Sequence, residues 1–135
     1  MVKAPKLYFL DTGLAAYLTQ WSSPQTLEAG ASGGVFFETW AMTEIIKSYW
    51  HNGKTAAMYF YRDADQKEID LIIVQDGQVL PVEIKKSSAP TKKDVRHFSV
   101  LKKLKMPVGP GVVLCMTDVT MPITGTVQAV NVSQI

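Results

Sequence analysis

The stretch EIDLIIVQDGQVLPVEIK, residues 68–85, decides the fold of this chain. Two apolar runs flank the pair Asp76-Gly77, and an Asp-Gly pair between apolar runs is the strongest short-range signal of a β-hairpin. We therefore expect strands over 69–74 and 79–85, joined by a two-residue turn.

This turn determines which side chains face each other across the hairpin. The numbers of paired residues sum to 153, so Asp70 lies across from Glu83. By the same count, Glu68 lies across from Lys85. Opposed side chains have Cβ atoms about 4.5–5.5 Å apart, and like charges at that distance repel. Because side chains alternate along a strand, the four charges share one face of an otherwise apolar hairpin.

A charged cluster on a buried hairpin costs stability, which makes it a candidate functional site. Two carboxylates with a backbone carbonyl and waters suit the oxygen preference of Mg²⁺. The Lys85 ammonium is placed to hold a water or to stabilise negative charge on a phosphate. The alternative is a set of cross-strand salt bridges, from Glu68 to Lys85 and from Asp70 to another base. A bulge at Pro81, which lacks a ladder donor, would shift the register.

The pattern outside the hairpin predicts helices that cover the sheet. Apolar residues at helical spacing predict a helix over 35–50, with His51-Asn52-Gly53 as its C-cap, and an amphipathic helix over 91–104. Apolar runs predict further strands over 7–10, 57–62, 112–116 and 126–132, a helix cap at 11–13 and a loop over 22–34. The order of helix, three strands, helix and strand indicates an α/β fold, in which helices flank a central mixed sheet.

The composition excludes several classes of protein. The chain has 135 residues, of which 47% are hydrophobic and 19% charged, and its mean hydropathy is +0.05. These values predict one soluble globular domain over 21–135, preceded by a preamble over 1–20 that resembles the tail of another module. We expect a cytoplasmic protein without a membrane partner, since no apolar run spans a bilayer and no signal peptide opens the chain. The lone Cys115 excludes a disulfide framework and a cysteine zinc site.

Basic residues gather after the hairpin. Residues 85–105 hold eight lysines and arginines against one acid, Asp94. Such a run is a candidate contact surface for a polyanion, and a solvated helix face is the alternative. Within this run, the candidate contacts for a nucleic acid are Lys86, Lys92, Lys93 and Arg96.

At this point the sequence resembles a known family. An acid on one strand, then Glu83-Ile84-Lys85 on the next, then a helix and a strand resemble the PD-(D/E)XK nuclease superfamily, with a restriction endonuclease-like core. Five segments in order resemble, more narrowly, the C-terminal domain of a large prokaryotic family of AAA+ ATPases: KLYFLDTGL at 6–14, FE at 37–38, YR at 61–62, EIDLI at 68–72 and PVEIK at 81–85. Ile69 stands where the nominal nuclease motif has proline.

The resemblance implies roles for individual residues. Asp70 and Glu83 would be metal ligands, with the carbonyl of Ile84 completing the site. Lys85 would be the catalytic lysine, and Glu38 on the first long helix would be an extra acid directed at the metal or its water. The implied cofactor is Mg²⁺ or Mn²⁺. No phosphate-binding loop of an ATPase occurs in these residues, so the implied AAA+ module lies outside them.

The leading hypothesis is therefore a metal-dependent nuclease-like hydrolase, an endonuclease or exonuclease acting on DNA phosphodiesters. The alternative is a non-catalytic module that binds a nucleic acid or a protein partner for the ATPase. Three smaller expectations complete the analysis. Glu44 lies on another side of its helix from Glu38. Arg62 makes an ion pair with Asp63 or Glu68, with contact to a phosphate as the alternative. His51 and His97 form no zinc site.

Overall fold

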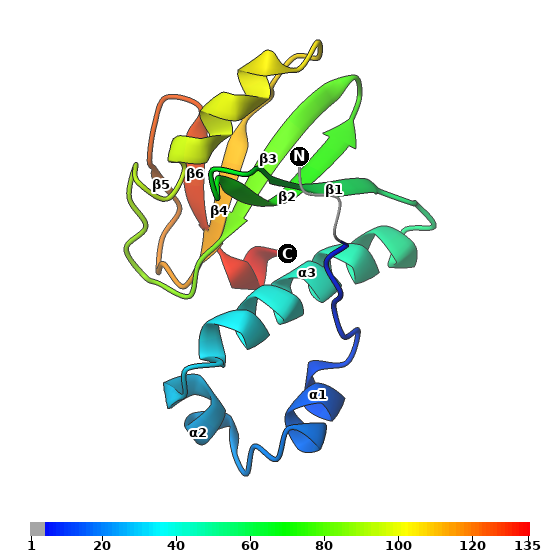
Figure 1. Cartoon of the computed structure of the whole chain (residues 1–135), viewed down its shortest axis with the longest axis vertical. Coiled ribbons are helices and arrows are strands. Elements are labelled where there is room, and N and C mark those ends of the chain that lie inside the picture. Colours follow the sequence, from blue (N-terminus) through cyan, green and yellow to red (C-terminus); the bar gives the residue numbers. More distant parts are fainter. Residues whose placement is uncertain (1–4) are drawn as a thin grey trace.

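A six-stranded mixed sheet forms the centre of the fold, with the long helix α3 across one face (Figure 1). The computed structural model describes residues 5–135. The sheet order is β1-β2-β3-β4-β6-β5. The strands are β1 (Ala57–Arg62), β2 (Glu68–Gln75), β3 (Gln78–Ile84), β4 (Gly111–Cys115), β5 (Met121–Pro122) and β6 (Val127–Asn131). The helices are α1 (Thr12–Leu18), α2 (Pro24–Ala29), α3 (Gly33–His51) and two 3₁₀ helices, η1 (Arg96–Lys103) and η2 (Val132–Gln134).

The predicted hairpin is confirmed at its turn. Asp76 and Gly77 have φ values of 50° and 74°, as a type I′ turn requires at both central positions. The pairing of Gln75 with Gln78 starts an antiparallel ladder without a bulge at Pro81. β1 adds a third antiparallel strand, whereas β4 pairs with β3, and β6 with β4, in parallel.

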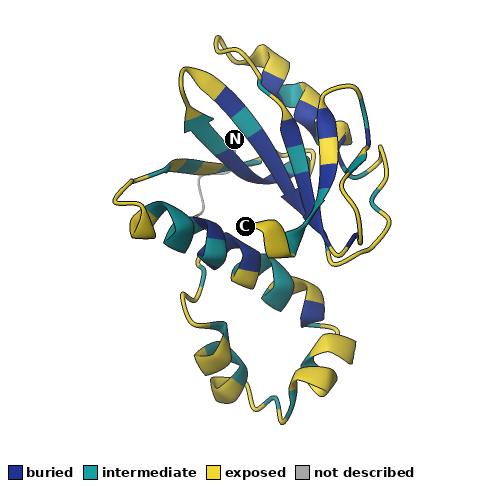
Figure 2. Cartoon of the chain, turned by 180° about the vertical axis from the view of Figure 1, so that it is seen from behind, coloured by how far each residue is buried: buried dark blue, intermediate teal, exposed yellow. Residues whose placement is uncertain are grey.

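Two apolar clusters lie on opposite faces of the sheet. One joins α3 to alternate residues of β2 and β3, among them Leu71, Val82 and Ile84. The other lies under η1 and includes Ile72, Val79, Phe98 and Leu101. Because side chains alternate along a strand, the residues of β2 and β3 that precede or follow Leu71, Val82 and Ile84 in sequence face the η1 side. The buried residues of β2, β3 and β4 lie between the two clusters (Figure 2).

Residues 91–104, here called the basic segment, differ from the prediction. The segment is not an α-helix over 91–104, because residues 91–95 form turns and a 3₁₀ helix begins at Arg96. The Asp94 carboxylate accepts hydrogen bonds from the Thr91 N–H at 2.7 Å and its hydroxyl at 3.0 Å, and so stabilises the turn. The apolar residues Val95, Phe98, Leu101 and Leu104 are spaced by three. That spacing keeps one row on a 3₁₀ helix with three residues per turn, whereas on an α-helix it drifts.

The N-terminal region also departs from expectation. Residues 7–10 form no strand, because they pair with no strand of the sheet, and Leu7, Phe9 and Leu10 are exposed. Asp11 does cap α1, as expected, by accepting a hydrogen bond from Leu14 N at 2.9 Å. The predicted loop over 22–34 contains α2, which begins because Ser23 forms a capping box and Pro24 occupies the first turn.

The helices α1 and α2 lie below α3 and have no buried residues (Figures 1 and 2). Among the described helices, none is long and apolar enough to cross a membrane.

Candidate functional site

The candidate site forms where the ladder between β2 and β3 ends. The last paired residues are Leu71 and Val82. Beyond them, the Asp70 carboxylate accepts a hydrogen bond from the backbone N–H of Ile84 at 2.9 Å. Asp70 is 7% exposed and Glu83 is 6% exposed. The hairpin thus brings two buried carboxylates together, as its register predicts.

Glu83 is only partly neutralised by its neighbours. Its Oε1 atom lies 2.7 Å from the Lys85 ammonium, which lies 3.9 Å from Asp70 Oδ2. Its Oε2 atom is the one buried side-chain oxygen without a hydrogen-bond partner among residues 5–135. A buried carboxylate oxygen without a donor costs free energy. Within the described residues, nothing offsets the cost of burying this oxygen.

The pKa values reflect this environment. Burial, and then the charge of Asp70, raise the pKa of Glu83 to about 7. Burial raises the pKa of Asp70 as well, against the opposing effect of the Ile84 N–H. Burial alone would lower the pKa of Lys85, but its contact with Glu83 outweighs burial and raises it. A neutral Glu83 beside a charged Lys85 is thus accessible near neutral pH.

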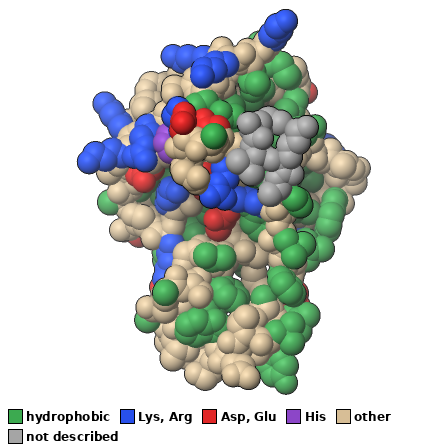
Figure 3. Space-filling view, in the orientation of Figure 1, with side chains coloured by type: hydrophobic (Ala, Val, Ile, Leu, Met, Phe, Trp, Pro, Cys, Tyr) green, Lys and Arg blue, Asp and Glu red, His purple; other side chains and the backbone are tan. Residues whose placement is uncertain are grey.

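A pocket of about 230 Å³ opens over the acid pair on the η1 side. Its walls combine the acids with side chains of the basic segment: Glu68, Asp70, Glu83, Lys85, Lys93, Asp94, Arg96 and His97. The surface shows Lys and Arg side chains beside acidic ones in this half of the molecule (Figure 3). The expected juxtaposition of carboxylates and basic residues is therefore present for Lys93 and Arg96.

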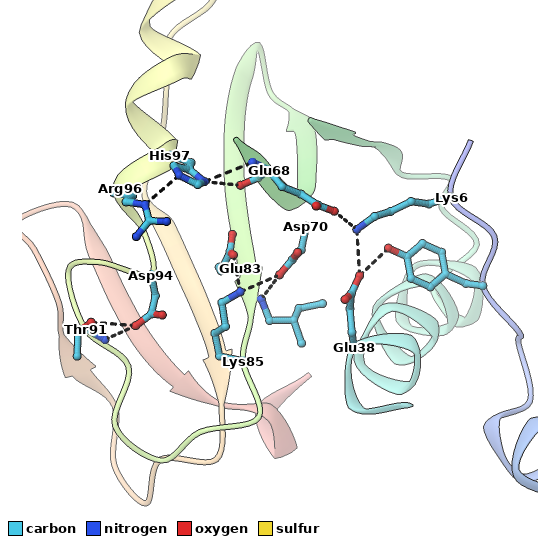
Figure 4. A network of polar contacts seen from close by, with 12 residues as sticks. Lys6, Glu38, Glu68, Asp70, Glu83, Lys85, Thr91, Asp94, Arg96 and His97 are labelled. Atoms are coloured by element: carbon cyan, nitrogen blue, oxygen red, sulfur yellow. Dashed lines mark hydrogen bonds and ion pairs between the residues drawn. The ribbon is translucent and has the colours of Figure 1, made fainter. Parts of the chain in front are cut away.

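His97 joins η1 to β2. Arg96 Nε donates to His97 Nε2 at 2.9 Å. On the other side of the ring, Nδ1 lies 3.3 Å from the backbone N–H of Glu68 and 3.2 Å from its backbone oxygen (Figure 4). These bonds hold the basic rim of the pocket, formed by Lys93 and Arg96, over the start of β2.

Glu38 lies beside the pocket but does not line it. Its Oε1 atom accepts hydrogen bonds from the Tyr8 hydroxyl at 2.9 Å and from the Lys6 ammonium at 3.2 Å. Lys6 also contacts Glu68 Oε1 at 2.5 Å (Figure 4). The predicted pairing of Glu68 with Lys85 is wrong, because the ladder ends before these residues and Lys6 binds Glu68 instead.

The structure separates other predicted residues from the pocket. Lys86 points to α2, where its ammonium donates to the backbone oxygen of Glu28. Lys92 does not line the pocket. Glu44 pairs with Lys47 at 2.8 Å, away from Glu38 as expected. Arg62 forms the expected ion pair with Glu68, at 4.0 Å.

Within residues 5–135, no group of three His, Cys, Asp or Glu side chains is placed to hold a metal ion. Any metal here would depend on two carboxylates with backbone or water oxygens.

Sequence reasoning did not find four residues around the site: Lys6, Tyr8, Asp94 and His97. Lys6 and Tyr8 are two apart in an extended segment, so they face one side, and this alternation was the available signal. Asp94 and His97 depend on how residues 91–97 turn over the hairpin, which no local pattern reports.

The fold and site together define an α/β domain with a buried acid pair under a basic rim. The chain belongs to the family described as a domain of unknown function, DUF4143, whose model matches residues 33–135. The match starts at the first residue of α3 and includes Glu38, both buried acids, Lys85 and the basic rim. A comparison with curated proteins finds no match.

Proposed function

We propose that this domain is a divalent-metal-dependent, nuclease-like hydrolase that acts on DNA phosphodiesters. The observation that carries the proposal is the buried pair Asp70 and Glu83, with Glu83 Oε2 unpartnered among the described residues. A fold tolerates a buried, unsatisfied carboxylate where another function depends on it.

The residues present fit a hard divalent cation. Asp70 and Glu83 would hold it, with the Ile84 carbonyl as a further oxygen, and Mg²⁺ and Mn²⁺ prefer such ligands. The bound cation would supply charge neutralisation at a phosphate and would lower the pKa of a coordinated water. It would also offset the burial and the Asp70 charge that together raise the pKa of Glu83.

The protein side chains supply the remaining chemistry. Lys85, held 2.7 Å from Glu83, would orient the attacking water or stabilise charge on the phosphate oxygens. Arg96 and Lys93 on the pocket wall would bind flanking phosphates through charge-assisted hydrogen bonds.

The attachment of this domain to an AAA+ ATPase, and its place in the PD-(D/E)XK superfamily, are parts of the same proposal. Both rest on the resemblance of the five sequence segments. The sheet with its antiparallel β1-β2-β3 and parallel β4 agrees with the helix, three-strand, helix and strand order of that superfamily, with η1 in the place of the second helix.

Metal binding is the first test. Calorimetric titration of the metal-free chain with Mn²⁺ should show binding that Asp70→Asn with Glu83→Gln abolishes. Glu44→Gln, which removes an acid on α3 that pairs with Lys47, is the matched control and should bind normally. Equal heats for all three proteins would refute the proposed site.

Cleavage is the second test. Linear, circular and single-stranded DNA would be incubated with the chain, and with its full-length ATPase if the attachment holds, in Mg²⁺ or Mn²⁺. Lys85→Ala and Asp70→Ala should each lower the rate by about a hundredfold or more. Cleavage unaffected by either substitution would come from a contaminant or another site.

A second candidate is a non-catalytic module that binds a protein partner. The observation in its favour is an apolar hollow of about 580 Å³ between α1, α2 and the start of α3, lined by Tyr17, Trp21, Phe36, Phe37 and Trp40 among others. Hydrophobic side chains surround this lower part of the surface (Figure 3). Failure to bind millimolar Mn²⁺ in the presence of DNA would favour this function.

A further inference from the structure

The segment over residues 5–10, here called the N-terminal strap, crosses α3 and reaches the acidic site (Figures 1 and 4). None of the described backbone–backbone hydrogen bonds outside helices and strands involves a strap residue. Leu7 is 90% exposed, and Phe9 and Leu10 are each 49% exposed. Lys6 and Tyr8 are the half-buried members of the strap. The strap is therefore held by side chains at the site rather than by a strand ladder.

Lys6 is the centre of this attachment. Its ammonium bridges Glu38 on α3, at 3.2 Å, and Glu68 at the start of β2, at 2.5 Å. It also lies 5.7 Å from the centre of the Phe60 ring. Burial disfavours the charged form of Lys6, but the two carboxylates outweigh burial and raise its pKa. The bridge thus puts a fixed positive charge beside the buried acid pair.

This charge acts on the proposed metal ligands. Among the smaller influences on the pKa of Asp70, the charge of Glu38 raises it and the charge of Lys6 lowers it. The geometry agrees, because Glu68, which Lys6 contacts, lines the same pocket as Asp70. While Lys6 and Tyr8 both donate to Glu38 Oε1, this oxygen is occupied and the charge of the Glu38 carboxylate is offset by the Lys6 ammonium.

We infer that the N-terminal strap regulates the acid pair as a displaceable, positively charged segment, which weakens divalent-cation binding while Lys6 and Tyr8 hold Glu38. This inference rests on the proposed function, because it requires a cation at Asp70 and Glu83. A divalent cation there repels the Lys6 ammonium and attracts Glu38. By linkage, strap docking lowers cation affinity by the same factor by which the cation lowers strap docking.

The first experiment measures strap release. Trypsin cleaves after Lys6 only when the strap is free to enter the protease, and mass spectrometry identifies the product that begins at Leu7. Mn²⁺ should accelerate this cleavage by on the order of tenfold relative to cleavage after the exposed Lys54, which is the internal reference. In Asp70→Asn with Glu83→Gln, Mn²⁺ should have no effect on this ratio. A ratio that Mn²⁺ leaves unchanged in the native chain, although Mn²⁺ binds, overturns the strap inference.

The second experiment measures cation affinity. Lys6→Met removes the charge and keeps the stem, and should lower the dissociation constant for Mn²⁺ by up to about tenfold. Lys47→Met removes a cation from the Glu44 pair on α3 and should leave the dissociation constant unchanged. Tyr8→Phe keeps the ring, which packs on the α3 cluster, and should strengthen Mn²⁺ binding less than Lys6→Met.

The two proposals fail in different ways. Native-like or weaker Mn²⁺ binding by Lys6→Met, with binding still abolished by Asp70→Asn and Glu83→Gln, overturns the strap inference alone. An absence of Mn²⁺ binding in the native chain and in Lys6→Met removes the proposed metal site, and the strap inference falls with it.

Discussion

Asp70 Oδ2 accepts the backbone N–H of Ile84 at 2.9 Å, at the point where the ladder between β2 and β3 stops. The carboxylate thus satisfies a buried strand donor that would otherwise have no partner. This bond anchors Asp70 next to Glu83. The acid that we propose as a metal ligand therefore also stabilises the hairpin, and the two contributions can be separated by substitution.

Asp70→Ala should destabilise the metal-free chain by about 1–3 kcal/mol, because the buried Ile84 N–H loses its acceptor. Asp70→Asn keeps an acceptor oxygen in place and should cost less. Urea unfolding at pH 7 measures both free energies. If Asp70→Ala were as stable as Asp70→Asn, the hydrogen bond would contribute little to the fold.

Lys85→Met should destabilise the metal-free chain at pH values above the folded pKa of Glu83, which is about 7. The Glu83 carboxylate then carries a buried charge without its ammonium partner, a loss of about 1–3 kcal/mol at pH 8. At pH 5 the neutral carboxyl should reduce the effect. The exposed pair of Lys67 and Asp65 offers the control, since Lys67→Met should leave the free energy of unfolding almost unchanged at either pH.

Arg96→Gln should weaken DNA binding and lower the slope of log affinity against log salt by about one, if Arg96 contacts a phosphate. Fluorescence anisotropy at several salt concentrations measures this slope. Lys54→Gln, a change on the exposed segment after α3, should leave the slope unchanged. Equal slopes for Arg96→Gln and the native chain would exclude Arg96 from the interface.

The hairpin was predictable because its information is local. The pair Asp76-Gly77 adopts positive φ at both positions, and this turn fixes the register that brings Asp70 and Glu83 together. The same register wrongly pairs Glu68 with Lys85. The ladder between β2 and β3 ends at the pair Leu71 and Val82, before it reaches Glu68. Glu68 instead binds Lys6, which is 62 residues away in sequence.

The basic segment shows a second limit of periodicity. Val95, Phe98 and Leu101 form a buried row as predicted, whereas Leu104, predicted in the same row, lies past the end of η1 and is 48% exposed. Spacing by three fits a 3₁₀ helix as well as an α-helix. The bonds between Thr91 and Asp94 turn the chain before η1. Such side-chain bonds compete with helix formation and are hard to weigh from sequence.

Gly77→Ala should destabilise the fold by about 1 kcal/mol or more, since φ is +74° there and a Cβ atom strains this conformation. Gly34→Ala, in α3 with nothing within 4 Å of the added Cβ, should be neutral or stabilise the fold by up to about 1 kcal/mol. Thermal unfolding of both variants checks the opposite signs. A Gly77→Ala variant as stable as the native chain would argue against the type I′ turn.

Glu83→Gln should make the stability of the metal-free chain less sensitive to pH between about 4.5 and 7. In the unfolded chain Glu83 ionises near its ordinary pKa of 4.5, whereas burial and Asp70 hold the folded pKa at about 7. Between these values the folded state binds more protons, so rising pH favours unfolding by up to about 3 kcal/mol. Glutamine has no proton to lose, and the melting temperature of the variant relative to the native chain should rise from pH 4.5 to pH 8.

Glu44→Gln is the control, because Glu44 is a partly exposed acid paired with Lys47, and the difference in melting temperature between this variant and the native chain should stay nearly constant. A Glu83→Gln difference that stays flat or falls over this range would show that the Lys85 contact stabilises ionised Glu83 more than burial opposes it.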